Sequence, residues 1–413
     1  MPPWPKRTVD LLILGIWVAA LTMVGVVIAD ARSDRAPASA TAPSTVEAQS
    51  PTTTSPQSEI DPNASTGSTT DGSTTVDPAA TGPATGASTT TTTLPPLLVA
   101  AGGDVMGDRQ VAAFIDEHGG EAVFADVAPY LSDAHVTFVN LESPLSDQGS
   151  RETGKSVTFR GKTALVDGIA SAGVDVVSLA NNHALDWGAA ALLDTIERLS
   201  SAGVAVAGAG PDSAAARAPA VLETQAGTVA VLAFADIVPA GFSAGTDRAG
   251  VNSAKTDRQR LLDDIAAAAD RADYVLVSFH WGLEYDGYAG EAQRTLAHQA
   301  VDAGADLVIG HHPHVLQGLE IYKNKLIAYS LGDFVFDHYS RATGEAVILR
   351  VMMSPDGPPA LTVIPVYLED PHGIPRPVHG QEAAAILDRL AGFSERLGLT
   401  LTRGGDMAGY APR

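Results

Sequence analysis

Short apolar runs alternate with longer stretches of helical character over most of the chain, from residue 97 to about residue 398. The runs are rich in β-branched residues and end at turn-forming residues such as Gly, Asn and Asp, which is typical of buried strands. They predict strands at residues 97–101, 135–140, 174–179, 204–207, 228–235, 274–279, 306–309, 325–330, 346–352 and 361–367.

The stretches between these runs carry apolar residues at helical spacing and predict helices at residues 110–117, 188–202, 257–269, 291–303 and 381–397. In the second of these helices, one face is expected to carry Leu192, Leu193, Ile196 and Leu199. Alternation of strands and helices predicts an α/β fold. Because no internal repeat or second linker is evident, we expect one globular domain over residues 97–400, followed by a frayed, Gly-rich tail over residues 401–413.

The first 30 residues have the pattern of a membrane anchor. Lys6 and Arg7 precede an uncharged, mainly apolar run at residues 11–29, which is about long enough to cross a bilayer as a helix. The basic flank predicts a cytoplasmic amino end, a single span, and an extracytoplasmic remainder. The sequence Ala29-Asp30-Ala31 resembles a signal-peptidase site, so cleavage of residues 1–30 and secretion is the alternative.

Residues 31–96 differ in composition from the rest of the chain. From Ala36 to Pro96 the segment consists largely of Thr, Ser, Ala, Pro and Gly and contains no Lys, Arg or aromatic residue. Such a segment buries too little apolar surface to offset the entropy lost on ordering. We expect a disordered linker that holds the following domain away from the membrane, with a short match to a glycosylation site at Asn63.

Charge and cysteine content exclude several classes of function. The 413 residues carry a formal net charge of -22 and include no cysteine. An acidic chain is a poor ligand for nucleic acid, which requires a basic surface, and has no charge attraction to anionic lipid headgroups. Without cysteine there is no disulfide, thiolate ligand or cysteine nucleophile. Any metal must therefore be held by oxygen and imidazole nitrogen.

Potential metal ligands directly follow several of the predicted strands. Asp104 follows the first strand and Glu142 the second, while His312 and His314 flank Pro313 after a later strand. One such residue alone more often caps a helix or forms a turn. Because the carboxyl ends of strands in an α/β sheet border the usual ligand crevice, we expect the set to share one site. The set is Asp104, Glu142, Asn182, His183, His280, His312 and His314.

A mixed set of oxygen and imidazole ligands suits a divalent metal such as Mn, Zn or Fe, and either one or two ions fit. Two adjacent ions would stabilise an oxyanion and activate a bridging water. This favours a metal-dependent hydrolase or transferase, with His183, Asp186 and Glu284 as catalytic candidates. His183 is a general acid or base in one interpretation and a ligand in the other.

Four basic residues are candidates for binding an anionic substrate through charge and hydrogen bonds, and a solvated surface position is the alternative for each. They are Arg109, Arg160, Lys162 and Arg294. The most suggestive segment is Phe159-Arg160-Gly161-Lys162.

The motifs, in this order, resemble the bacterial capsule-synthesis CapA family over roughly residues 98–337. The segments that carry the resemblance are Gly103-Asp104-Val105-Met106, Asn140-Leu141-Glu142-Ser143-Pro144, Asn181-Asn182-His183-Ala184-Leu185-Asp186, His280-Trp281-Gly282 with Glu284-Tyr285, and Gly310-His311-His312-Pro313-His314 with Gln317. The resemblance implies a metallophosphatase-like, layered α/β/β/α sandwich, here preceded by the anchor and the linker.

The chain departs from the wider dinuclear phosphoesterase pattern at two positions. Met106 stands where that pattern has a His ligand, and Glu142 stands in place of the bridging Asp. The first departure weakens the case for one metal position. His311 leaves the register of the last His pair open by one residue, and Asp333, where the family often has Asn, is assigned no role.

The resemblance implies a membrane-anchored protein that supports synthesis, export or attachment of an anionic capsule polymer such as poly-γ-glutamate, with capsule synthase or export subunits as partners. An extracellular metal-dependent phosphoesterase with a phosphate-containing substrate is the second interpretation. A non-catalytic, polymer-binding scaffold with a vestigial site is the third. The identity of the metal, the polymer and the oligomeric state stay open at this point.

Overall fold

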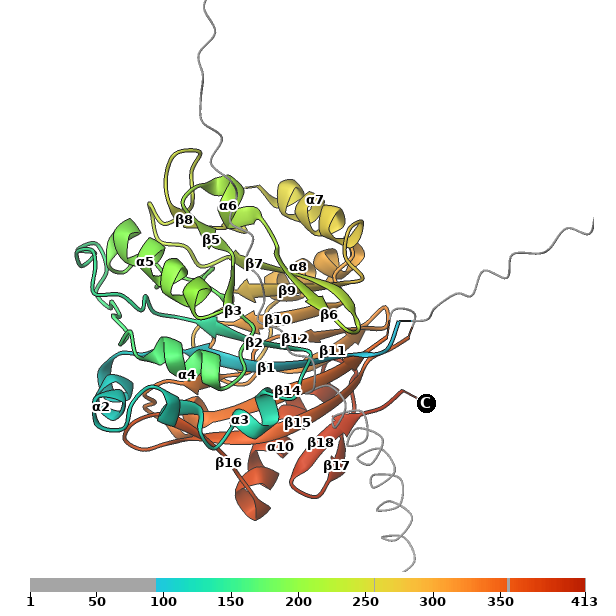
Figure 1. Ribbon diagram of the computed structural model, residues 1–413. Coiled ribbons are helices and arrows are strands. Elements are labelled where there is room, and N and C mark those ends of the chain that lie inside the picture. The colour runs from blue at the N-terminus through green and yellow to red at the C-terminus, as the bar shows by residue number, and fades with distance from the viewer. Residues whose placement is uncertain (1–93, 256, 355–356, 413) are drawn as a thin grey trace, which may run out of the picture. The chain divides into compact units, whose positions relative to one another are not determined.

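The computed structural model describes residues 94–412 except 256 and 355–356 (Figure 1). The predicted anchor or signal peptide at residues 1–30, the sequence match at Asn63 and nearly all of the predicted linker lie outside the described residues. Within the described residues, no helix combines the length and the apolar character that a membrane span requires.

Ten strands form the larger sheet, in the order β17-β18-β15-β14-β1-β2-β3-β4, with β13 paired to β1 and β16 paired to β15 (Figure 1). Strands β1 to β4 pair in parallel, whereas the pairs from β1–β14 outwards are antiparallel. The strands are β1 (Leu97–Val105), β2 (Val136–Leu141), β3 (Val176–Ser178), β4 (Ala205–Ala207), β13 (Asp333–Val335), β14 (Glu345–Met353), β15 (Ala360–Glu369), β16 (Ile374–Pro377), β17 (Thr402–Gly404) and β18 (Met407–Tyr410).

Six strands form the second sheet, in the order β11-β12-β10-β9-β7-β6, and its four central strands are parallel. They are β6 (Ala220–Thr224), β7 (Gly227–Ala235), β9 (Tyr274–His280), β10 (Leu307–His311), β11 (Leu319–Tyr322) and β12 (Lys325–Ala328). A small two-stranded sheet joins β5 (Ala209–Gly210) to β8 (Gly250–Val251).

Helices connect most of the parallel strands. They are α2 (Arg109–His118), α3 (Ala128–Leu131), α4 (Leu165–Ser171), α5 (Gly188–Ser201), α6 (Ser213–Arg217), α7 (Arg258–Ala269), α8 (Glu291–Asp302), α9 (Arg341–Gly344) and α10 (Gly380–Glu395), with a 3-10 turn, η1, at Glu121–Phe124. Helix α7 begins where the Asp257 side chain accepts a hydrogen bond from the backbone N–H of Arg260, which satisfies an otherwise free helix donor.

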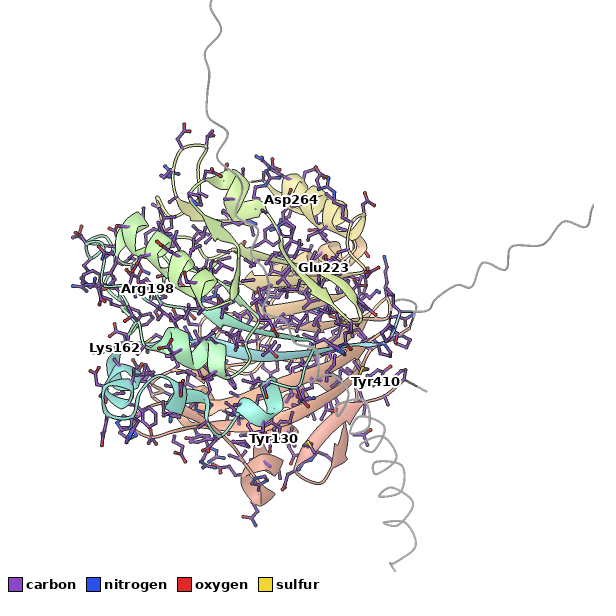
Figure 2. The ribbon with its side chains drawn as sticks, viewed as in Figure 1. Tyr130, Lys162, Arg198, Glu223, Asp264 and Tyr410 are labelled. Carbon is purple, nitrogen blue, oxygen red and sulfur yellow. The ribbon has the colours of Figure 1, made fainter. Side chains whose placement is uncertain are left out.

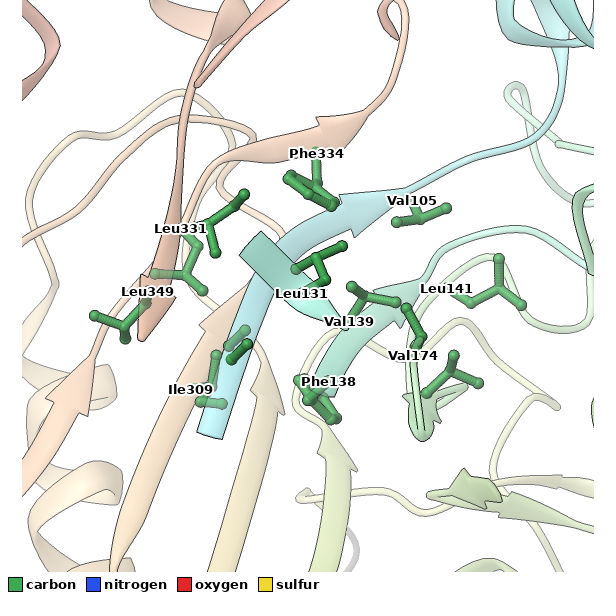
Figure 3. Close-up of a cluster of buried hydrophobic side chains, with 14 of the residues drawn as sticks. Val105, Leu131, Phe138, Val139, Leu141, Val174, Ile309, Leu331, Phe334 and Leu349 are labelled. Carbon is green, nitrogen blue, oxygen red and sulfur yellow. The ribbon is translucent and has the colours of Figure 1, made fainter. Parts of the chain in front are cut away.

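The alternation of side chains along β7 explains how the second sheet is packed. Val229 and Val231 face one way and join the core that the two sheets share, whereas Ala230 and Leu232 face the other way and pack against α7 and α8. Figure 3 shows part of the shared core, including Ile309 of the second sheet. Helices α3 and α5 pack on the first sheet. The predicted α/β class is therefore confirmed, with two facing sheets and helices on their outer sides.

All the strands and helices predicted above are present, although their ends shift by a few residues. Leu193 was predicted to lie on the same face of α5 as Leu192 and Leu199, but it does not. The buried face is centred on Leu192 and Leu199, and Leu193 is 37% exposed. The prediction of a frayed tail is wrong. Strands β17 and β18 form a hairpin that pairs with β15, and Leu401 is buried beside it.

Candidate metal centre

Strand ends from both sheets bring buried donor side chains together. Asp104 lies near the end of β1 and Glu142 directly follows β2, while His280 ends β9 and His312 and His314 follow β10. The ligand atoms fall into three groups, each with all atoms within 4.8 Å of one another. The groups are Glu142, His280 and His312; Asp104, Glu142 and His314; and Glu284, His312 and His314.

Glu142 is the central residue of this cluster. Both of its carboxylate oxygens are buried and make no hydrogen bond, and the Nδ1 atoms of His280 and His312 are buried without a partner as well. Burial, together with the negative charge of Asp104, raises the pKa of the Glu142 carboxyl well above its usual value. Unsatisfied buried groups of this kind are costly unless a cation lies between them. Carboxylate oxygen and imidazole nitrogen fit Mn, Zn or Fe, so the residues present fit a divalent metal.

Asp104 is held in place by three neighbours. Its Oδ1 accepts a hydrogen bond of 2.8 Å from the Asn140 side chain and lies 3.0 Å from Nδ1 of His311, and its Oδ2 accepts from the backbone N–H of His312 at 3.0 Å. Burial alone would raise the pKa of Asp104, but the hydrogen bond and charge of His311 and the charges of other histidines hold that pKa below its usual value. The carboxylate is therefore fixed in an ionised, oriented form.

His314 is supported by a carboxylate that the sequence did not reveal as functional. Its Nδ1 lies 2.8 Å from Oδ1 of Asp333, and its Nε2 lies 4.0 Å from Oε1 of Glu142. Burial alone would lower the pKa of His314, but the charges of Asp333 and Glu142 outweigh it and raise the pKa to about 10. A carboxylate that fixes the ring of a candidate ligand in this way is common around metals in proteins.

His280 and His312 are the neutral members of the cluster. Burial, and next the charge of His312, lowers the pKa of His280 well below its usual value. Burial, and next the charge of His314, lowers the pKa of His312 to about 3. Neutral imidazole is the form that binds metals. Nε2 of His280 lies 2.9 Å from the amide oxygen of Asn182 and 3.5 Å from Glu142, so an amide oxygen also reaches this group.

The backbone around the last His pair is strained. His312 has φ 97, His314 has φ 56, and Tyr285, whose N–H donates to the carbonyl of Pro313 at 2.8 Å, has φ 64. Side chains other than glycine rarely occupy this left-handed region, and a residue before proline ordinarily favours an extended conformation. Strain of this kind persists where the surroundings enforce it, often at functional sites.

The three catalytic candidates occupy different places. His183 lies outside the three converging groups, with its Nδ1 2.6 Å from Oδ2 of Asp186 and its ring centroid 4.2 Å from that of Phe159. Asp186 is fully buried beside it and does not belong to any of the three groups. Glu284 is exposed and joins His312 and His314 in the outermost group. This arrangement favours His183 as an acid or base rather than as a ligand.

Among the basic candidates, Arg109 is connected to the cluster through aromatic rings. Its guanidinium lies 4.7 Å from the centroid of Phe159, which packs on His183. It also donates to the Tyr339 hydroxyl at 2.5 Å and lies 3.4 Å from a carboxylate oxygen of Asp337.

The other three basic candidates have partners elsewhere. Arg160 stacks on Trp187 at 4.0 Å and donates to two backbone carbonyls. Lys162 lies at the surface near α4 and pairs with Asp116 at 2.7 Å (Figure 2). Arg294 lies on the exposed side of α8, the helix that covers the outer face of the second sheet. Their predicted roles in substrate binding stay predictions.

Several residues around the cluster were missed at the sequence level. Asn140, Asn181 and His311 lay in motifs that had been noticed. Asn140 and His311 contact Asp104, and the Asn181 amide donates to the Asn140 side chain. Asp333 begins β13, a short strand that was not predicted, and its position opposite Asp104 follows only from the pairing of β13 with β1. Lys155 lies in an irregular loop and carries no sequence signal.

Replacing His312 with alanine is expected to lower the bound metal, because this ring belongs to two of the three groups. His183→Ala is expected to lower it less, since its ring lies outside those groups. The metal content of each purified variant can be measured by inductively coupled plasma mass spectrometry. Unchanged occupancy in a folded double variant would refute both expectations.

Several known proteins are similar to this chain. A family model described as "Bacterial capsule synthesis protein PGA_cap" matches residues 98–338, which contain every donor described above. The "Capsule biosynthesis protein CapA" of Bacillus anthracis is 36% identical over 283 residues, which are 67% of this chain and 68% of that protein.

Two further relatives are similar. The "PGA biosynthesis protein CapA" of Bacillus subtilis (strain 168) is 32% identical over 278 residues, covering 67% of this chain and 72% of that protein. A protein of Mycobacterium tuberculosis described as a probable polyglutamine synthesis accessory protein is 36% identical over 212 residues, covering 49% of this chain and 56% of its own length.

Proposed function

The chain belongs to the bacterial capsule synthesis protein family, and from this premise we propose that it supports synthesis of an anionic, polyglutamate-type capsule polymer through a divalent-metal site. The names of the two Bacillus relatives support the capsule role. The observation that carries the metal site is Glu142, whose two buried oxygens make no hydrogen bond and lie among His280, His312 and His314. A vestigial site would not be expected to keep an uncompensated carboxylate at this position.

A divalent ion held by these residues would supply positive charge for an oxyanion that develops during hydrolysis or transfer at an amide or phosphate centre. His183 has the geometry of an acid or base. The Asp186 carboxylate can only accept a hydrogen bond, so Nδ1 of His183 carries the proton and donates to it. Nε2 of the same ring then has a lone pair that can take up a proton. Asp333 fixes the His314 ring in the same manner. The metallophosphatase-like character of the two-sheet fold is part of this proposal.

Arg109 is the residue that we assign to the anionic part of the substrate. Its carboxylate contact with Asp337 is long, at 3.4 Å, so its planar donors are only partly used. A chain of formal charge -22 needs such a local cation, because its overall field repels a polyanion.

We also propose that the described domain lies outside the cytoplasm, tethered by the apolar run at residues 11–29 and working with capsule synthase or export subunits. Support comes from the basic pair that precedes the run, Lys6 and Arg7. Secretion after cleavage near Ala29 is the alternative, and mass spectrometry of the protein purified from membranes distinguishes the two.

The choice of reaction is tested with the full-length protein in detergent, loaded with Mn²⁺. Turnover of a γ-glutamyl peptide supports the capsule-polymer reaction, and turnover of p-nitrophenyl phosphate or its diester supports the phosphoesterase alternative. Metal binding with no turnover of either class favours a scaffold. Glu142→Gln serves as the control, since any true turnover should vanish in it.

Arg109→Ala is expected to weaken binding of an anionic substrate about tenfold, the effect of one lost charged hydrogen bond of roughly 1.5 kcal/mol. Metal content should not change, because the guanidinium contacts the site only through Phe159. Isothermal titration of the metal-loaded protein with a γ-glutamyl peptide measures the effect. Arg160→Ala, measured alongside, tests the remaining prediction of an anion contact there, and an unaltered affinity rejects it.

A further inference from the structure

Lys155 reaches from the loop between β2 and α4 into the neighbourhood of the candidate metal centre. Its side chain is only 15% exposed. The ammonium donates to Oδ1 of Asp186 and to the backbone carbonyl of Asn182, and it lies 3.2 Å from Nδ1 of His183. One cation therefore touches three residues of a single loop.

Each of these contacts leads to a group of the proposed site. Oδ2 of Asp186 lies 2.6 Å from the His183 ring, so the orientation of that carboxylate decides the orientation of the imidazole. The side chain of Asn182 places its amide oxygen 2.9 Å from Nε2 of His280. Lys155 is thus connected to the candidate acid or base, His183, through Asp186. It is connected to His280, a histidine of the converging groups, through Asn182.

The loop that carries Lys155 is docked by other bonds as well. The backbone N–H groups of Ser150, Glu152 and Phe159 donate to the carbonyl of Trp187, the carbonyl of Asp186 and the Asp186 carboxylate, at 3.1, 2.7 and 2.7 Å respectively. None of these three hydrogen bonds involves the Lys155 ammonium, so the loop is docked independently of it. Placing a largely buried ammonium beside a candidate cation site is costly, and loop docking by these backbone bonds does not require it.

We infer that Lys155 is a positioning residue of the metal site: its ammonium holds the Asp186 carboxylate and the Asn182 backbone, and so fixes the His183 ring and the Asn182 amide oxygen. This inference rests on the proposed metal-dependent function. The compact ammonium donates to two acceptors on different residues of the loop, the Asp186 carboxylate and the Asn182 carbonyl, and the planar fork of an arginine does not reproduce this arrangement.

The test uses cobalt binding to the full-length protein in detergent. Metal-free wild type, Lys155→Met and Lys155→Arg are titrated with Co²⁺, and the visible absorption bands report the geometry around the ion. Lost support of metal ligands typically lowers affinity about 10–100-fold. We expect a loss in this range for Lys155→Met, a smaller loss for Lys155→Arg, and altered bands in both. Lys323→Met is the matched control, because Lys323 is exposed and paired with Asp302 at 2.5 Å in a distant turn.

The thermal unfolding of each metal-free variant is recorded first. If Lys155→Met does not fold, Lys155→Arg decides the matter, since it keeps the charge beside Asp186. Wild-type affinity and bands in every folded variant overturn the inference, and so does unfolding of both variants, which would make Lys155 a residue of the fold alone. Failure of the wild type to bind Co²⁺ at all contradicts the proposed metal site instead.

Discussion

Glu142→Gln is expected to lower the affinity for a divalent metal by at least about 100-fold. Glu142 belongs to two of the three groups of converging donors, so its loss removes a ligand from both. Loss of an outer-shell partner alone typically costs about 10–100-fold in affinity, and loss of a shared ligand should exceed that. The amide has nearly the same shape, so the packing around it should persist.

The same substitution should stabilise the metal-free protein. The pKa of Glu142 in the native state is raised well above 4.5, first by burial and then by Asp104. At pH values between 4.5 and the native pKa, the native state therefore binds a proton that the unfolded chain has lost, and native stability falls as the pH rises through that range. Glutamine is neutral at every pH and removes this loss. The free energy of unfolding should rise by about 1–3 kcal/mol.

These opposite effects are measured by metal titration and by urea unfolding in the presence of a chelator. Glu223→Gln is the matched control, since Glu223 is an exposed residue of β6 whose carboxylate accepts one hydrogen bond from Thr228. If Glu142→Gln bound metal with wild-type affinity, or if the metal-free variant were less stable than the metal-free wild type, Glu142 would not be a metal ligand.

Removal of metal from the wild type is expected to lower its melting temperature by about 5–10 °C. A ligand present at 100 times its dissociation constant stabilises the native state by about 2.7 kcal/mol, and each kcal/mol shifts the midpoint of a domain of this size by roughly 2–4 °C. The physical source is the burial of Glu142 beside Asp104, which disfavours the ionised form of Glu142 unless a cation lies between the two groups.

Differential scanning calorimetry of the loaded protein, of the protein after dialysis against EDTA, and after return of Mn²⁺ measures this shift. Glu142→Gln should show almost no difference between the three states. Identical melting of all three wild-type samples, with metal content verified in each, would mean that bound metal is not coupled to the fold.

The sequence predicted the strands well, and it located the polar residues that follow them, because both depend on local pattern. A buried strand needs a run of apolar residues, and a donor at its end is visible as the next polar residue, as for Glu142 after β2. Pairing of β1 with β2 and of β9 with β10 then brings these ends together. The exposure of Leu193 differed from the prediction, because helical spacing of apolar residues locates the buried face of a helix with an uncertainty of about one residue.

The contacts that could not be predicted join segments of the chain that no local sequence pattern relates. Lys155 meets Asp186 across a loop whose conformation is set by scattered backbone hydrogen bonds. The hairpin of β17 and β18 was hidden by its glycines, which indicate flexibility in a sequence but form a turn here, with Gly405 at φ 65. Arg160 was selected for its charge, yet its stacking on Trp187 depends on tertiary structure.

The central claim is that donors from both sheets hold a divalent ion around Glu142. Crystals of the protein soaked in Mn²⁺ and measured at the manganese absorption edge test it directly. We expect an anomalous peak bounded by Glu142, His280 and His312, with or without a second peak beside Asp104. A fully soaked crystal with no peak among these side chains would contradict it.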